Sequence, residues 1–437
     1  MDKLLRIQKL KDISQTTPYT SGIRIPYRGD TLNLNAYQIP LEYLIYNKYN
    51  GRIASFVKSF ERQDHTLDAE NPEDAKIIEQ FLWDSKLDRN KQTMSDLIRN
   101  RQRVYGIVTF EGKIIDGNRR AMLLNKINAP SKEKKQKTID LDFALYFVAV
   151  ILPDDVKDDK EISKLETIYQ MGEDKKLDYN PIEKYLKCAD LKGIFGFTEI
   201  EIAEMMTEKD ITIKEWLEIK KLMDDYLTYY GYDEIYTRLD KREGQFVDLN
   251  GYIKRYQSKI KDKNVQWMYK DVDVAAQKAV SFDYIRAQYE GKQFRSIGQT
   301  SKSGSIFQYE DIWQEFLENH ETKIDPISDA EPTVEEIRKE NPGSDISKLL
   351  EARDAGWIEK VKGHLEGNLN IGESRLQNKR EANEPMQLVR KALDSLKSIN
   401  TNVASFYDME IDKLLSEMVH IINEYRPMIQ KSAKKIS

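Results

Sequence analysis

Hydrophobic residues in the first part of the chain follow two different patterns. Between residues 52 and 100 they recur at helical spacing, which predicts helices broken by one polar stretch. Two short runs at 104–110 and 113–116 are rich in β-branched and aromatic residues, and they predict strands joined by a tight turn. A helix is expected to start at 121. The segment 141–153 is the most apolar of the chain, and its Phe, Tyr and Val content favours a buried strand over a core helix.

From residue 161 onward the pattern is helical nearly to the end of the chain. Helices are predicted at 161–172 and 180–196. Asn180 is a typical N-cap, Pro181 suits the first helical position, and Glu183 three residues past the cap indicates a capping box. A short part that contains strands is thus followed by a long helical part, which predicts an α+β fold.

Two capped helices joined by a turn form a helix-turn-helix candidate. Thr198 can cap the first helix, and Glu201 completes a second capping box. A turn at 207–212 leads into the second helix, at 213–227. Residues 181–230 contain 7 lysines, no arginine and 11 acidic residues, a net charge of −4. A helix that reads DNA bases needs Arg, Asn or Gln and enough positive charge for the phosphates, so this charge argues for a helical subdomain instead.

Shifts in composition predict six parts of the chain. Arg24, Arg28 and the neighbouring Pro-Tyr pair suggest an extended N-terminal arm rather than a helix. The stretch 325–345 is acidic and contains proline, which is typical of a linker. The parts are an arm at 1–35, a small mixed α/β domain at 36–160, a helix-turn-helix-like domain at 161–240, a helical domain at 241–324, a linker at 325–345 and a C-terminal helical region at 346–437.

The C-terminal region is predicted to contain two amphipathic helices, at about 386–399 and 403–425. Their broad apolar face suits either an intramolecular hairpin or the seam of a homodimer. A lysine-rich stretch at 131–137 is predicted to be a solvated loop.

Composition and charge narrow the class of protein. The 437 residues are 40% apolar and 33% charged, which suits two or three packed domains with much charged surface. The net charge of −5 excludes a protein that binds nucleic acid over its whole surface. Cys188 is the single cysteine, which excludes an internal disulfide and a cysteine-based zinc site, and the four histidines stand at no ligand spacing. With no apolar run near the ~18 residues of a membrane span and no secretory signal, we expect a cytoplasmic protein without membrane contact.

One constellation suggests chemistry, namely a strand that ends at Asp116 and is followed by Gly117, Asn118, Arg119, Arg120 and a helix. Glycine lets the backbone approach a ligand closely, and the start of a helix favours an anion. Two adjacent arginines add donors that suit phosphate oxygens. These residues predict a phosphate-binding corner, and the simpler interpretation is a turn followed by a surface helix.

Four stretches, in this order, resemble the ParB/sulfiredoxin superfamily, specifically the N-terminal and central domains of ParB-like proteins. The resemblance covers residues 36–230 and does not extend to 240–437. The stretches are an Asn-rich turn that ends in arginine at 46–53, the Gly-polar-Arg-Arg box at 112–124, a helical glutamate followed by Asn-Pro-Ile-Glu at 164–184, and the opening of a helix-turn-helix at 195–206.

The resemblance implies a small mixed α/β unit that binds a nucleoside triphosphate such as CTP or ATP. Gly117, Arg119 and Arg120 would hold the phosphates, with Asp116 and Asn118 completing the corner. Arg52, from the first stretch, would reach the phosphates from the side. Relatives use the nucleotide in different ways: some hydrolyse it, some close a clamp on DNA and some transfer phosphate.

The resemblance also implies magnesium near Glu166, because a carboxylate is the ligand type that this ion prefers. The sequence departs from the family here, since Asn118 replaces the usual glutamate and Thr167 replaces the usual asparagine. Asp116 has three interpretations: a second metal ligand, an acceptor that orients an arginine, or a cap at the end of the strand.

Three functions fit these residues. The leading hypothesis is a ParB-like protein that binds an NTP with magnesium, hydrolyses it slowly or not at all, and couples occupancy to binding of DNA or a protein partner, with a homodimer through the C-terminal helices. The second is a small-molecule kinase or a nuclease-type effector of phage defence on the same fold. The third is a DNA-binding or assembly module with a vestigial pocket.

Overall fold

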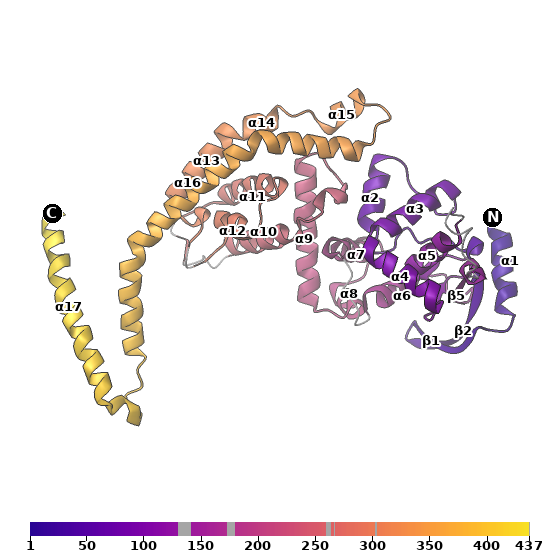
Figure 1. Ribbon diagram of the computed structural model, residues 1–437, viewed down its shortest axis with the longest axis horizontal. Helices are drawn as coiled ribbons and strands as arrows, with labels where there is room; N and C mark the ends of the chain where they lie inside the picture. Colours follow the sequence, from indigo (N-terminus) through magenta and orange to yellow (C-terminus); the bar gives the residue numbers. More distant parts are fainter. Residues whose placement is uncertain (130–140, 173–179, 259–263, 266, 302–303, 437) are drawn as a thin grey trace. The chain divides into compact units, whose positions relative to one another are not determined.

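The computed structural model describes residues 1–129, 141–172, 180–258, 264–265, 267–301 and 304–436. These residues form two compact units, 1–371 and 372–437. The first unit combines a five-stranded mixed sheet near the N-terminus with a long succession of helices (Figure 1). The predicted α+β fold is therefore confirmed. Within the described residues, no helix has both the length and the apolar content that crossing a bilayer requires.

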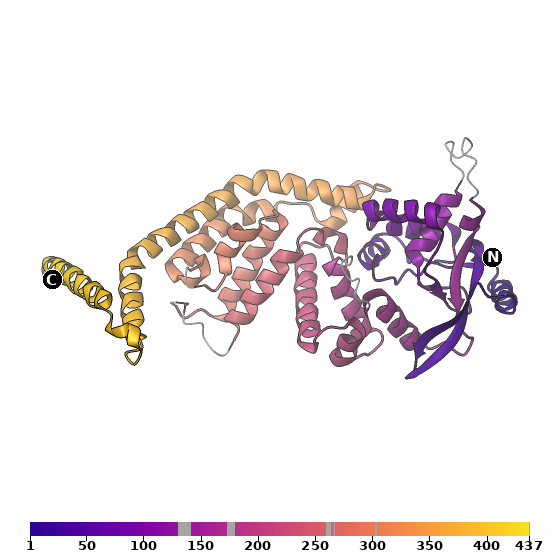
Figure 2. The same ribbon diagram turned by 60° about the horizontal axis from the view of Figure 1, so that its bottom comes forward.

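The sheet has the strand order β1-β2-β5-β3-β4, in which β3 runs parallel to β5 and the other neighbours are antiparallel. The long β1–β2 hairpin is seen most clearly in Figure 2. The strands are β1 (Thr20–Tyr27), β2 (Asp30–Pro40), β3 (Gly106–Val108), β4 (Ile114–Asp116) and β5 (Tyr146–Ile151). The strands predicted at 104–110, 113–116 and 141–153 correspond to β3, β4 and β5, and a 3-10 turn at Asp142–Leu145 precedes the last.

Helices cover both faces of the sheet. One face packs against apolar residues of α2 to α5, including Val57 and Leu123, around Phe147 of β5. The other face packs against Leu165 of α6. Burial on both sides explains why β5 is a continuous apolar run in the sequence. The helices are α2 (Ala54–Gln63), α3 (Pro72–Asp84), α4 (Leu87–Asn100), α5 (Asn118–Asn128) and α6 (Asp159–Thr167), which a π-helical turn at Ile168–Gly172 extends.

The helices between residues 52 and 100 are confirmed. The helix predicted after β4 is present as α5, but it begins at Asn118 and not at 121. The solvated loop predicted at 131–137 lies outside the described residues.

The extended arm predicted for residues 1–35 is wrong. Residues Lys3–Ser14 form helix α1, and the following residues form β1 and part of β2. α1 is held by Arg6, whose Nε donates to a main-chain carbonyl in the β3–β4 turn at 2.7 Å. β1 belongs to the sheet because Ile23 and Ile25, two positions apart, both point into the core. Residues Thr20–Tyr27 are extended, as the sequence suggests, but they form a strand that pairs with β2 and not a free arm.

Three helices follow α6 and position the helix-turn-helix candidate. They are α7 (Pro181–Gly193), α8 (Glu199–Met206) and α9 (Asp210–Tyr229). The Asn180 side chain accepts from the first turn of α7 at 3.1 Å, which confirms this N-cap. Thr198 and Glu201 form the predicted capping box. The box predicted at Glu183 is wrong, because its carboxylate is turned toward Ser55 at the start of α2.

The remainder of the first unit is helical, and the linker predicted at 325–345 is also wrong. This segment forms two short helices, α14 and α15, and Glu331 between them is buried in an ion-pair network. The helices of this region are α10 (Glu243–Tyr256), α11 (Asp271–Arg286), α12 (Gly291–Gly298), α13 (Glu310–Lys323), α14 (Asp325–Asp329), α15 (Val334–Glu340) and α16 (Ile346–Lys397).

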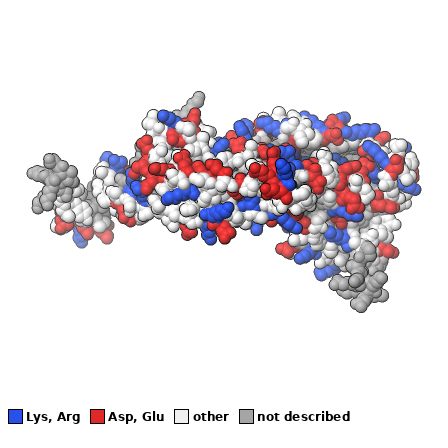
Figure 3. Space-filling view, turned by 90° about the horizontal axis from the view of Figure 1, so that it is seen from above, with Lys and Arg blue, Asp and Glu red and all other residues white. Residues whose placement is uncertain are grey.

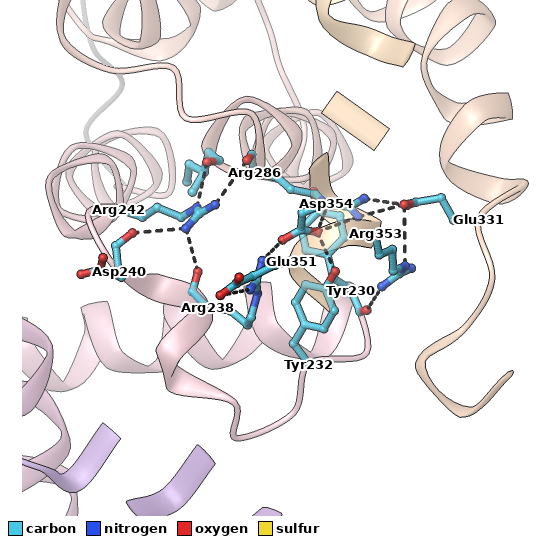
Figure 4. Close-up of polar contacts among 11 residues, drawn as sticks. Tyr230, Tyr232, Arg238, Asp240, Arg242, Arg286, Glu331, Glu351, Arg353 and Asp354 are labelled. Atoms are coloured by element: carbon cyan, nitrogen blue, oxygen red, sulfur yellow. Dashed lines mark hydrogen bonds and ion pairs between the residues drawn. The ribbon is translucent and has the colours of Figure 1, made fainter. Parts of the chain in front are cut away.

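Buried charged residues connect α11, the α14–α15 segment and α16 (Figure 4). The fully buried Arg286 donates to the two carboxylate oxygens of Glu331 at 2.6 and 3.0 Å and to Asp354 at 2.8 Å. Asp354 also accepts from Arg238. The Arg286 guanidinium lies 4.4 Å from the ring centroid of Trp357. This network explains why an acidic segment that resembles a linker is part of the folded core.

The second unit contains the end of α16 and helix α17 (Met409–Ile436). The helix predicted at 386–399 is the end of α16, and the helix predicted at 403–425 is α17, which follows a 3-10 turn at Ala404–Tyr407. Many large apolar side chains of α17 are exposed, namely Met409, Leu414, Met418, Val419, Ile421, Ile422, Tyr425, Met428 and Ile429.

Candidate phosphate-binding site

The corner between β4 and α5 depends on Gly117. This residue has a φ of 101°, in the left-handed region, and it stands at the N-cap of α5. A Cβ atom here would lie 2.5 Å from Cζ of Phe147, so the glycine is required both by the turn and by packing against β5. Gly117 offers no side-chain cap to α5. A helix start of this kind, with glycine at the N-cap, is an end of a helix that favours an anion.

Asn118 joins the corner to the turn that carries Arg52. The Asn118 side chain is buried; its Oδ1 accepts from the main-chain N–H of Asn47 at 2.8 Å, and its Nδ2 donates to the Ile114 carbonyl at 3.1 Å. The same turn continues through Asn50, whose Oδ1 accepts from the N–H of Arg52 at 3.0 Å. The structure thus brings together two stretches that are 71 positions apart in sequence.

Arg120 is engaged within the protein. Its guanidinium donates to the carbonyls of Val104 and Tyr105, the latter at 2.9 Å, and to Oδ2 of Asp116 at 2.6 Å. Asp116 thus accepts a hydrogen bond from an arginine, which agrees with one of its three interpretations. Arg120 clamps the end of β4 to the residues before β3. The neighbouring Arg119 is half-buried in the first turn of α5.

Glu166 lies in a buried polar chain behind the corner. Its Oε1 accepts from Gln170 at 3.2 Å, and its Oε2 pairs with Nζ of Lys187 at 3.1 Å. Gln170 also donates to the carbonyl of Ile115 in β4 at 3.0 Å. Both carboxylate oxygens are thus occupied, and one faces an ammonium group that repels a cation. The arrangement does not fit the magnesium ligand that the resemblance implies.

The first turn of α2, directly after Arg52, holds a carboxylate. Both oxygens of Glu183 accept from the main-chain N–H of Ser55, at 3.3 and 3.2 Å, and the Ser55 hydroxyl donates to the same group. Glu183 is buried, and this burial raises the pKa of its carboxyl to about 7, against the lowering effect of the hydrogen bonds from Ser55 and Ala54. No local pattern in the sequence predicts this contact, because Ser55 and Glu183 are 128 positions apart.

The helix-turn-helix candidate offers little free positive charge. On α9, Lys214 pairs with Asp210 at 3.2 Å and Lys220 pairs with Asp224 at 2.6 Å. A DNA contact of the α8–α9 pair would therefore be local and salt-sensitive. On the face of the molecule seen from above in Figure 3, Lys and Arg are likewise scattered among Asp and Glu.

In comparisons with known proteins, no protein-family model and no curated protein matches this sequence. The resemblance described above therefore rests on its four sequence stretches.

Proposed function

We propose that the β4–Gly117–α5 corner binds the phosphate groups of a nucleoside triphosphate in a cytoplasmic, ParB-like protein. The observation that carries this proposal is the buried Asn118 bridge, which joins the turn of Arg52 to the start of α5. Main-chain N–H groups at the helix start, Arg119 beside them and Arg52 in the joined turn would supply the donors. Arg120 acts as a positioning residue through Asp116.

Occupancy of the corner would be coupled to the helices that follow it. Gln170 connects β4 to Glu166 on α6, and Glu166 is paired with Lys187 on α7. Ser55 at the start of α2 donates to Glu183, which also belongs to α7. Both contacts end on α7, which leads into the α8–α9 pair. A shift of α7 on nucleotide binding would therefore reach the surface where DNA or a protein partner binds.

The proposed binding does not involve a magnesium ion held by Glu166 or Asp116. Both carboxylate oxygens of Glu166 are engaged by Gln170 and Lys187, and Asp116 is paired with Arg120. The magnesium dependence of binding is instead a quantity to measure.

The test is a calorimetric titration of the full chain with each of the four NTPs, with and without magnesium. Arg119→Ala should weaken binding at least about 10-fold, because a charge-assisted hydrogen bond contributes about 1.5–3 kcal/mol. The matched control is Arg28→Ala, which removes the same group from an exposed pair with Asp158 at 3.0 Å and should leave binding unchanged. Arg120 is a poorer probe, because its loss would release β4.

Equal affinity of wild type and Arg119→Ala would contradict the proposed contact. If no NTP binds, the result would favour another of the functions considered above, a DNA-binding or assembly module with a vestigial pocket. The engaged state of Arg120 and Glu166 is the observation in favour of that candidate.

A further inference from the structure

Three residues from different helices present possible ligand atoms to one point, away from the corner. They are Asp283 in α11, His320 in α13 and Asp325 at the start of α14. Nε2 of His320 lies 2.8 Å from Oδ2 of Asp283 and 3.7 Å from Oδ1 of Asp325. One ligand atom from each residue lies within 4.8 Å of the other two, and this is the only such group of three or more His, Cys, Asp or Glu residues in the part of the chain that the structure describes.

The group is held in place from several sides. The Tyr230 hydroxyl donates to Oδ1 of Asp283 at 2.8 Å, which leaves Oδ2 directed at the histidine. The His320 ring is buried, and its Nδ1 makes no hydrogen bond within the described residues, so the polar contacts of the ring run from Nε2 to the two carboxylates. α13 is capped at its end by Ile324, whose N–H donates to the carbonyl of His320 at 2.8 Å in a last helical hydrogen bond. α14 begins directly after it with Asp325, one residue more than a helical turn beyond His320.

Charge and access both suit a cation. Asp283 and Asp325 surround one imidazole, and the carboxylates of Glu321 and Asp329 lie close enough to act on Asp325 electrostatically. The side chain of Asp325 is 47% exposed, whereas those of His320 and Asp283 are 2% and 4% exposed. An ion could therefore enter from the Asp325 side and keep water as its remaining ligand.

We propose that Asp283, His320 and Asp325 bind a divalent transition-metal ion, with Zn²⁺ or Mn²⁺ as the fitting chemistry. One imidazole and two carboxylates are donors that these ions accept, and three protein ligands with an open position are a common zinc arrangement. Mg²⁺ is disfavoured by the nitrogen ligand. The site is separate from the corner and does not depend on nucleotide binding. The sequence did not indicate it, since the three residues stand at no recognisable ligand spacing.

The competing interpretation is an internal His–Asp ion pair that stabilises the helices without a metal. The variant Asp325→Asn distinguishes the metal site from the ion pair. It removes the third ligand, while the Asp283–His320 contact stays in place. The control is Asp329→Asn, which removes the same charge from a neighbouring carboxylate that is not in the group.

The experiment uses the full chain after treatment with a chelator. Zn²⁺ and Mn²⁺ binding is measured by calorimetry, and thermal unfolding is followed with and without Zn²⁺. Wild type and Asp329→Asn should bind one Zn²⁺ per chain and unfold at a higher temperature with it. Asp325→Asn should bind at least about 10-fold more weakly and lose the thermal shift, with an unchanged circular dichroism spectrum. Absence of binding in wild type, or equal binding by Asp325→Asn, would overturn the proposal and leave the ion pair as the role of these residues.

Discussion

At the scale of single residues, the candidate site combines side chains that the sequence indicates with partners that it does not. Gly117, Arg119 and Arg120 are recognisable because they stand together between a strand and a helix. Their environment is set by distant residues: Asn118 meets Asn47, 71 positions away. No local pattern encodes such a contact, since it depends on which turn the fold places beside the helix start.

Glu183 gives a prediction on pH at this scale. Burial raises the pKa of its carboxyl to about 7 in the folded protein, above the ordinary value in an unfolded chain. The folded chain therefore holds this proton more tightly, and the contribution of Glu183 to stability is fully present below about pH 4.5. As the pH rises from there through about 7, this contribution is lost, and the free energy of unfolding falls by roughly 2–4 kcal/mol. At higher pH Glu183 causes no further change in stability.

The test compares wild type with Glu183→Gln, which keeps an oxygen that can accept from Ser55 but cannot ionise. Denaturant unfolding at pH 5, 6, 7 and 8 should show that the variant gains stability relative to wild type as the pH rises through this window. Parallel curves for the two proteins would show that Glu183 does not titrate there.

At the scale of the helices and strands, the sequence predicts an element correctly where residues close by in the sequence determine it. The helices between residues 52 and 100 and the capping box at Thr198 are of this kind. The errors occur where a distant partner decides. The strand β1 forms because β2 pairs with it, and the segment 325–345 is ordered because Glu331 meets Arg286, 45 positions earlier. Composition alone cannot distinguish such an acidic segment from a linker.

The ion-pair network around Arg286 gives the prediction at this scale. Arg286→Met would leave the carboxylates of Glu331 and Asp354 buried without their main partner. Loss of one partner of a buried pair typically costs about 3–5 kcal/mol. We therefore expect a large fall in the denaturant midpoint, together with new protease cleavage between residues 325 and 345.

The control for this variant is Arg295→Met, which breaks an exposed pair with Asp248 at 3.0 Å and should change stability little. Similar midpoints for the two variants would mean that the network does not hold the 325–345 segment in place.

At the scale of the whole molecule, the second unit raises the question of assembly. Apolar residues of α17 repeat at an interval of seven: Ile411, Met418 and Tyr425 in one row, and Leu414, Ile421 and Met428 in another. A strict seven-residue repeat is the signature of a left-handed coiled coil. Most of these side chains are exposed within a single chain. We therefore predict a homodimer through this face, as the amphipathic pattern of the sequence suggests.

Two double variants with the same charge change test this dimer. Leu414→Asp with Ile421→Asp places charges in the apolar row, whereas Ser416→Asp with Asn423→Asp places them on the opposite face of the same helix. Light scattering after size exclusion should give a dimer for wild type and for the second variant, and a monomer for the first. A monomeric wild type would show that the exposed face of α17 serves another partner. If the first variant is monomeric but binds nucleotide as wild type does, assembly and the phosphate corner are separate functions of this chain.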